Sequence, residues 1–481
     1  MSISSEITRI SGNISDALEA IAAKGVTVPN DATSDDLATL ISQISSSSVG
    51  EGLVWMDNEG FVHLEPNQEY TSAPEKWINF IDYDGTILYS YTKTEFAELE
   101  ELPPNPTHSN LVSQGWNWRL TDIQSELTNG GLSKIWVGQM YNTQSGKTEI
   151  DVEFNNPDYL SPYLAVGTYS YTTLTVDWGD GSTPYSSNNN NASGVRYIQH
   201  TYLSVGKYTI KISAGESMYY FYNGYGSGHP SILYIEESSG DGNKTRNSTY
   251  ANCIKAIRVS DYCNINAGAF RTLYGLEYMT ISNTISNVID PSYYPLRYYA
   301  WTQDTSLKSL TIPYGVVKST YNYNFFSGCT SLKNVSVPPT LDISTITECY
   351  YDCKNLVHPY YPSTWTSIPS KYFYGCVSLR DVTLPSSGLT TIEQNAFNNN
   401  SSLMEITIPA TVTTIGNDTF RYNYYMIYHF LSTTPPTLSN STVFGGITSD
   451  CKIYVPAASV NAYKTATNWS TYADYIEAEP T

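Results

Sequence analysis

From residue 253 onward, apolar residues recur in one short pattern. An apolar residue is followed by two variable residues, a second apolar residue, one variable residue and a third apolar residue, often before proline, as in SLKSLTIP at 306–313. A period of about 24 residues predicts a leucine-rich solenoid, in which each repeat adds one short strand to a parallel ladder. The leading apolar residues are Ile254, Leu276, Leu307, Leu332, Leu356, Leu379 and Leu403.

Two further residue types keep register with this pattern. Six positions before each leading residue, from Leu276 onward, there is a large aromatic residue. These residues are Phe270, Trp301, Phe326, Tyr350, Phe373 and Phe397. A cysteine follows the aromatic residue by three positions in Cys329, Cys353 and Cys376. This spacing predicts a stacked aromatic column in the core and buried thiols rather than a disulfide framework.

The repeat stops near residue 431. A strand at 452–455 and a helix starting near Ala457 are expected to close the end of the solenoid, because an open end would leave apolar surface uncovered. Residues 250–481 are therefore expected to form a capped leucine-rich-repeat solenoid.

The first 48 residues place isoleucines at alternating steps of four and three. This heptad spacing favours a short coiled coil, and isoleucine at both core positions favours a trimer. A helical hairpin with residues 35–45, turning near Pro29, is the competing interpretation. In either case residues 1–48 are expected to be a helical anchoring or oligomerisation segment, with Ile3, Ile7, Ile10, Ile14 and Ile21 as its contact residues.

The middle of the chain is predicted to be mainly β. Residues 51–145 alternate short strands with one helix at 94–102, which indicates a small α+β domain. Residues 146–215 alternate apolar and polar positions between turn clusters, which is typical of an Ig-like β-sandwich. The predicted fold is thus mainly β and multidomain, with short N-terminal helices and the C-terminal solenoid.

Charge and composition exclude several classes of function. The formal net charge is −20, with no cluster of Lys and Arg, so we expect no nucleic-acid partner. No apolar run approaches the roughly 18 residues of a membrane helix, and no secretory signal is apparent, so we expect no membrane partner. The 43 tyrosines, together with many Ser, Thr and Asn residues, favour a binding surface.

The segment IDYDGTIL at 81–88 resembles the nucleophile motif of haloacid-dehalogenase-type phosphatases. That resemblance would make Asp82 the nucleophile and Asp84 the acid/base. The rest of such a catalytic domain does not follow, and Asp-Gly between apolar residues also predicts a plain hairpin turn. With no other catalytic pattern in the chain, we expect no enzyme activity, no cofactor and no catalytic or metal-binding residues.

The segments VDWGDGS at 176–182 and YIQHTYLSVGKYTIKIS at 197–213 resemble the polycystic-kidney-disease-type (PKD) Ig-like domain. Gly179 and Gly181 suit positive-φ turn positions, and Trp178 is expected to pack in the sandwich. A calcium ion on Asp177 and Asp180 is disfavoured, because two carboxylates fall short of the six to eight oxygens that calcium takes.

The repeats resemble the BspA-like leucine-rich class of bacterial surface proteins and gut-phage proteins, on the pattern S-L-x-x-[ILV]-[ST]-[ILV]-P followed by T-T-I-x-x-x-[AT]-F. The second part is seen at 390–397 and 413–420. The N-terminal stretch and the block from FIDYDGTILYSYT to QGWNW resemble segments of structural proteins of such phages. These resemblances imply a virion protein that is assembled in the host cytoplasm and exposed on the particle.

The resulting hypothesis is a non-enzymatic tail or baseplate protein. Its N-terminus would contact other virion proteins, and the heptad interpretation makes the protein a homotrimer. Its solenoid would bind a host-surface glycan or protein. A head-decoration protein, a bacterial surface adhesin and a phosphatase centred on Asp82 are the alternatives. The ligand-surface candidates are Tyr293, Tyr294, Tyr298, Tyr299, Tyr321, Tyr323, Tyr351, Tyr422 and Tyr424.

Overall fold

The computed structural model separates two compact units, Met1–Glu75 and Lys76–Thr481. It describes residues 54–56, 62–64, 75–168, 173–188, 194–215, 219–221, 232–238, 244–247, 252–261, 263–264, 270, 273–283, 303–315 and 324–480. In the first unit, β1 (Val54–Met56) and β2 (Val62–Leu64) form an antiparallel pair. The predicted helices of residues 1–48 and their five isoleucines lie outside the described residues.

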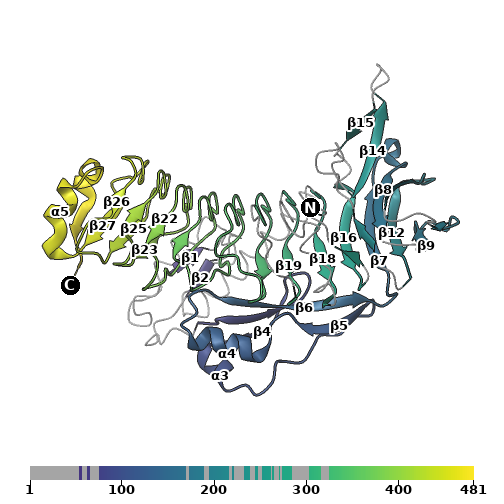
Figure 1. The fold of residues 1–481 in the computed structure, drawn as a ribbon, viewed down its shortest axis with the longest axis horizontal. Coiled ribbons are helices and arrows are strands. Elements are labelled where there is room, and N and C mark those ends of the chain that lie inside the picture. Colours follow the sequence, from purple (N-terminus) through teal and green to yellow (C-terminus); the bar gives the residue numbers. More distant parts are fainter. Residues whose placement is uncertain are drawn as a thin grey trace, which may run out of the picture. The chain divides into compact units, whose positions relative to one another are not determined.

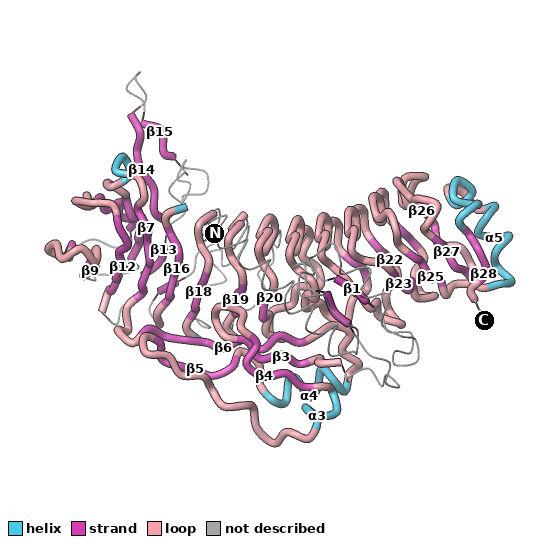
Figure 2. Tube along the Cα trace, turned by 180° about the vertical axis from the view of Figure 1, so that it is seen from behind, coloured by secondary structure: helices cyan, strands magenta, loops and turns pink. Residues whose placement is uncertain are grey.

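The second unit is mainly β, as predicted, and its C-terminal part is a solenoid (Figures 1 and 2). The leucine-rich pattern forms short parallel strands along one side of the solenoid, and the outward side of these strands is called the strand face below. They pair in three groups: β16 (Ile254–Val259) with β18 (Tyr278–Ile281), β19 (Ser309–Thr311) with β20 (Asn334–Ser336), and β23 (Glu405–Ile408) with β25 (Ile427–Phe430) and β27 (Lys452–Val455).

A parallel ladder runs along another side of the solenoid and uses the Thr-Ile segments of the repeat. Each of its strands is only two residues long, and Ile368, Ile392, Ile415 and Leu438 point from them into the core. Its strands are β21 (Ser367–Ile368), β22 (Thr391–Ile392), β24 (Thr414–Ile415) and β26 (Thr437–Leu438).

The predicted aromatic column is confirmed for the residues that the structure describes. Phe326, Tyr350, Phe373 and Phe397 are fully buried and stack in sequence, with ring centroids 5.4, 5.8 and 5.5 Å apart. Phe420 and Phe444 extend the column with two spacings of 5.7 Å. Phe270 is also buried, whereas Trp301 lies outside the described residues. The column continues two repeats beyond the six aromatic residues that were predicted to form it.

In the six repeats whose aromatic residues run from Trp301 to Phe420, the position three residues after the aromatic residue is buried and carries a polar group or a thiol. It holds Asp304, Cys329, Cys353, Cys376, Asn400 and Asn423, and we call it the ladder position. Several of these side chains donate to a backbone carbonyl of the preceding turn: Cys353 to Phe326 at 3.1 Å, Cys376 to Tyr350 at 3.0 Å and Asn400 to Phe373 at 2.7 Å. The predicted buried thiols are confirmed, and none of the seven cysteines is in a disulfide. Burial raises the pKa of the Cys353 and Cys376 thiols.

The predicted sandwich region is joined to the solenoid by a shared sheet. Strand β7 (Thr148–Phe154) pairs antiparallel with β12 (Gly206–Ser213) on one side and with β16, the first solenoid strand, on the other. The sheet order is β10-β9-β12-β7-β16-β18, so no break in pairing separates the two regions. This continuation covers the first turn of the solenoid, whose edge would otherwise be exposed.

The remaining strands of this region complete the two sheets. The first sheet also takes in β9 (Thr173–Asp177) and β10 (Tyr185–Asn188). The second has the order β15-β14-β8-β13-β17, with β11 also paired to β8. Its strands are β8 (Tyr163–Thr168), β11 (Gly194–Gln199), β13 (Tyr219–Phe221), β14 (Leu233–Ser238), β15 (Lys244–Asn247) and β17 (Cys263–Asn264).

Residues 76–144 form a separate four-stranded sheet, which we call the cover sheet. Its order is β4-β3-β6-β5, made of β3 (Ile78–Ile81), β4 (Ile87–Tyr91), β5 (Leu111–Trp116) and β6 (Ile135–Thr143). The helix predicted at 94–102 is shorter in the structure, where α3 covers Lys93–Ala97. Its start is fixed by a capping box between Thr92 and Glu95. A second helix, α4 (Leu120–Thr128), was not predicted, since its N-cap residue Arg119 provides no capping side chain.

The cover sheet packs on the strand face of the first repeats, where β6 lies across β18, β19 and β20 (Figures 1 and 2). Asn117 Nδ2 donates to Ile312 O at 2.7 Å, and Trp118 Nε1 donates to Val337 O at 2.9 Å. Gly138 is required at the contact, because a Cβ built there would lie 1.9 Å from Thr311 Oγ1. The cover sheet is therefore part of the solenoid's packing and hides one stretch of its strand face.

The C-terminal cap agrees with the prediction. Strand β27 occupies 452–455, and a 3-10 helix, η5 (Ala457–Ser459), leads into α5 (Val460–Thr465). The 3-10 helix η6 (Trp469–Tyr475) and β28 (Ile476–Ala478) complete it. Trp469 packs edge-on against Phe430 and so covers the last turn. Among the described helices, none combines the length and apolar character needed to cross a bilayer.

Candidate binding surfaces

The tyrosine-rich turns of the solenoid are the first candidate. We call the turn surface the group Tyr351, Tyr374, Tyr422, Tyr424 and Tyr425, which follow the aromatic column in their repeats. Three of the nine predicted ligand-surface tyrosines, Tyr351, Tyr422 and Tyr424, belong to it. The other six lie outside the described residues: Tyr293, Tyr294, Tyr298, Tyr299, Tyr321 and Tyr323.

The two ends of the turn surface differ in exposure. Tyr351 is half-buried and stacks on Tyr374 with ring centroids 4.8 Å apart. Tyr422, Tyr424 and Tyr425 are 37%, 39% and 56% exposed. Tyr425 was not among the nine predicted ligand-surface residues, although its position next to Tyr424 in the sequence could have indicated it. The exposed end therefore offers the larger accessible aromatic surface.

Two rings of the turn surface have a neighbouring cation. The Arg421 guanidinium lies 4.6 Å from the centroid of the Tyr422 ring, and Lys371 Nζ lies 5.8 Å from that of Tyr351. Lys371 is itself paired with Glu348 at 2.8 Å. Rings that are restrained in this way lose little conformational entropy on binding, and their flat faces suit a sugar ring or an apolar protein side chain.

The second candidate is a cleft of about 430 Å³, which we call the junction cleft. It lies where the cover sheet, the shared sheet and the first solenoid repeats meet. Tyr83 and His108 line it from the cover-sheet region, and Asp151 and Thr209 line it from β7 and β12. The solenoid contributes Ala256, Arg258, Tyr278 and Thr280 from β16 and β18.

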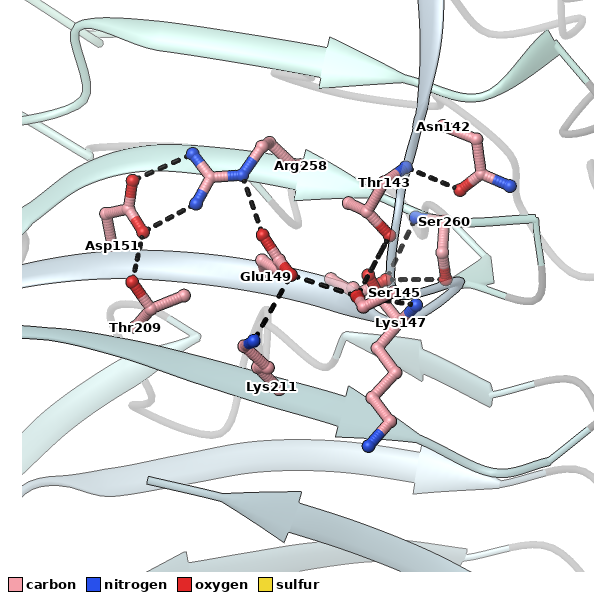
Figure 3. A network of polar contacts seen from close by, with 11 residues as sticks. Asn142, Thr143, Ser145, Lys147, Glu149, Asp151, Thr209, Lys211, Arg258 and Ser260 are labelled. Carbon is pink, nitrogen blue, oxygen red and sulfur yellow. Dashed lines mark hydrogen bonds and ion pairs between the residues drawn. The ribbon is translucent and has the colours of Figure 1, made fainter. Parts of the chain in front are cut away.

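Three residues in one wall of the junction cleft, Arg258, Asp151 and Thr209, belong to an ion-pair network, which Figure 3 shows. Arg258 donates from Nη1 and Nη2 to the two oxygens of Asp151 at 2.7 and 2.6 Å, and from Nε to Glu149 at 3.1 Å. Thr209 Oγ1 also donates to Asp151, at 2.8 Å. Burial alone would lower the pKa of Arg258, but the hydrogen bonds and charges of Asp151 and Glu149 raise it above its ordinary value. The guanidinium is thus a fixed, charged donor.

Asp82 lies behind this cleft and occupies the hairpin turn that the sequence predicted. Asp82 N donates to Thr86 O at 2.9 Å, and Gly85 in the turn has a φ of 87°. The Asp82 carboxylate accepts from Tyr141 Oη at 2.6 Å on Oδ1, and its Oδ2 lies 2.8 Å from His108 Nε2. Both oxygens therefore have partners within the protein, and the absence of an enzyme activity stays a prediction.

The W-G-D-G turn likewise uses its polar groups internally. Gly179 and Gly181 have φ values of 76° and 79°, and Trp178 is buried with the His200 ring stacked on it at 4.7 Å. Burial raises the pKa of the Asp180 carboxyl, but hydrogen bonds from Ser182 and His200 outweigh it and bring the pKa to about 2. In the described part of the chain, no group of three or more His, Cys, Asp or Glu residues is arranged to hold a metal ion.

Comparison with known proteins identifies the repeats. The BspA type leucine rich repeat region matches residues 244–346 and 294–427, in six copies. A leucine-rich repeat protein from Bacteroides ovatus is 16% identical with a TM-score of 0.26, over 46% of this chain and 61% of that one. A leucine rich cell surface protein from Faecalibacterium prausnitzii is also 16% identical, with a TM-score of 0.23, over 48% and 70%.

The chain thus spans less than two thirds of the Bacteroides ovatus protein. No curated protein sequence matches it. The match of the repeats to the BspA type confirms the predicted leucine-rich solenoid.

Proposed function

We propose that the protein is a non-enzymatic adhesion protein that presents the turn surface of its solenoid to a glycan or protein on a cell surface. The observation that carries the proposal is the exposed tyrosine group at 422–425, at the end of the turn surface where the rings are most accessible. A BspA-type repeat region supports the same role, because stacked repeats create an extended surface for binding.

We further propose that the protein is carried by a phage particle, anchored through residues 1–48 to other virion proteins on a tail or baseplate. This part of the proposal rests on the resemblance of the N-terminal segments to phage structural proteins. A head-decoration position and the bacterial cell surface are the alternatives, and the repeat region fits a bacterial adhesin equally well.

A binding assay tests the adhesive role. Fluorescently labelled full-length protein is applied to a panel of cultured gut bacteria and to purified mucin. The triple variant Tyr422→Asn/Tyr424→Ser/Tyr425→Ser removes the exposed rings, and asparagine suits position 422 because the equivalent Asn399 also has a positive φ. We expect roughly a tenfold or greater loss of binding, since each exposed aromatic anchor contributes on the order of 1 kcal/mol or more.

A matched control separates ring loss from hydroxyl loss. Tyr424→Phe/Tyr425→Phe keeps both rings and is expected to retain most of the binding. Undiminished binding by the triple variant would exclude the turn surface as the adhesive site. Mass spectrometry of purified phage particles and of washed bacterial envelopes then decides the location, and recovery in envelopes alone would reject the virion proposal.

A further inference from the structure

The junction cleft has the properties of a ligand site, and it is separate from the turn surface. Its volume of about 430 Å³ falls in the range of about 300–1,000 Å³ that small-molecule sites occupy. Its floor is Ala256, which lies opposite Asp151 on β7 and opposite Tyr278 on β18 in the paired strands. The small side chain of Ala256 between two longer ones leaves the hollow open.

Two tyrosines form an aromatic corner in the cleft. The rings of Tyr83 and Tyr278 lie 6.0 Å apart at an angle of 79°. Tyr278 is held in place by Lys308, whose Nζ donates to the phenol oxygen at 3.1 Å and lies 4.8 Å from the ring centroid. A flat ring that is fixed before binding is a suitable platform for the C–H face of a pyranose.

The charges that line the cleft are balanced. The two carboxylates of Asp151 and Glu149 offset the two cations beside them, Arg258 and Lys211, so the wall has no excess positive charge for an anionic ligand. The remaining N–H groups of Nη1 and Nη2 are still donors, because a guanidinium has five N–H groups and three are used in these contacts. The wall therefore offers hydrogen bonds without a net charge.

We infer that the junction cleft binds one unit of a neutral saccharide. One pyranose face would lie on the aromatic corner of Tyr83 and Tyr278. Its hydroxyls would take hydrogen bonds from Arg258 and give them to Asp151. A neutral polyhydroxyl compound matches the aromatic faces, the remaining guanidinium N–H groups and the balanced charge together, whereas an anion or a purely apolar ligand matches only part of them.

The test uses the full-length protein on an array of immobilised neutral oligosaccharides built from glucose, galactose and mannose, with sialylated and sulfated counterparts. Isothermal titration calorimetry then gives the affinity for the best neutral oligosaccharide. Ala256→Leu places a larger side chain in the space that the sugar would occupy. Tyr278→Ala removes one of the two aromatic rings on which the sugar would stack. Each is expected to weaken binding roughly tenfold or more, because each loses a stacking contact or the space for it.

Two controls keep the result interpretable. Tyr278→Phe keeps the ring and should retain binding within about threefold, which a variant that merely misfolds would not do. The triple variant of the turn surface should bind the neutral oligosaccharide as the natural protein does. The saccharide site in the cleft and the adhesive role of the turn surface can therefore be rejected separately. The inference is overturned if no neutral oligosaccharide binds, if the acidic counterparts bind more tightly, or if Ala256→Leu binds undiminished.

Discussion

The same repeat meets two different environments along the solenoid. In the repeats of β19 and β20, the cover sheet lies on the strand face, and we call this stretch the covered half. In the repeat at 378–385 and in those of β23 and β25, the strand face is exposed, and we call this stretch the open half. Thr311, Thr383 and Thr407 occupy the same repeat position, yet Thr311 is 6% exposed while Thr383 and Thr407 are exposed.

The difference shows that the cover, rather than the repeat, determines burial on the strand face. In the covered half, the side chains of Asn117 and Trp118 donate hydrogen bonds to backbone carbonyls of the repeats, and Gly138 packs closely against Thr311. These contacts exclude water from the strand face. In the open half, Met404 and Leu431 stay 55% and 52% exposed on the same face. The interior of the solenoid does not change between the halves, since the aromatic column runs through both.

The largest expected effect comes from removing the main side chain of the cover. Trp118→Ala deletes a ring that is 1% exposed, packs edge-on against Tyr360 and donates to Val337. We expect a loss of about 3–5 kcal/mol in the free energy of unfolding, measured by urea denaturation. Leu431→Ala in the open half should change it by less than about 0.5 kcal/mol. Equal losses would mean that the two halves are not distinguished by the cover.

The next prediction places one substitution at the same position in each half. Thr311→Trp introduces a large side chain against Gly138 and should cost about 1–3 kcal/mol or release the cover sheet, seen as faster proteolysis of residues 76–144. Thr407→Trp projects into solvent and should leave stability within about 0.5 kcal/mol. A stable, protease-resistant Thr311→Trp variant would show that the cover sheet does not pack on this strand as described.

The ladder position tests whether the interior is shared by both halves. Asn400→Ala removes the amide that donates to the carbonyls of Phe373 and Cys376, at a cost of about 1–3 kcal/mol for the two lost hydrogen bonds. Each carbonyl keeps one backbone N–H donor. Asn400→Cys should recover part of this loss, because Cys353 and Cys376 make the equivalent hydrogen bond in their own repeats. If alanine and cysteine behaved alike in thermal denaturation, the hydrogen bond would not be the source of the effect.

The most gradual effect is a pH dependence in the covered half. Asp304 is fully buried at the ladder position, and burial raises the pKa of its carboxyl well above the ordinary value of 3.8. A raised pKa in the folded state means that the stability is fully present below about pH 3.8 and falls as the pH rises through the folded-state pKa. The fall is at most about 1.4 kcal/mol for each pH unit.

The variant Asp304→Asn places an asparagine at the ladder position, as Asn400 and Asn423 do in later repeats. The asparagine side chain does not titrate. The variant should be more stable than the natural protein at neutral pH, and the difference should shrink towards pH 4. Unfolding free energies measured across this range check the sign. A difference that stays constant with pH would show that Asp304 does not titrate on folding.

Much of the fold could be predicted from the sequence because its signals are local. The repeat period predicted the solenoid, the aromatic spacing predicted the buried column, and Asp-Gly predicted the hairpin turn at Asp82. The helix α4 was missed for lack of a capping residue, and Asn400 and Asn423 were missed at the ladder position although they keep its spacing. The junction cleft had no local signal, since its lining residues come from segments far apart in the chain.

The sequence by itself determined the direction of each side chain in the repeat, because the period sets which residues point inward from their own backbone. Only the tertiary structure decided which outward residues are buried. Asn117 reaches Ile312 across 195 residues of sequence, and a contact at that separation leaves no mark on the repeat pattern. Thr311 and Thr407 therefore read alike in the sequence and differ in the fold, because burial depends on what packs against a residue from elsewhere in the chain.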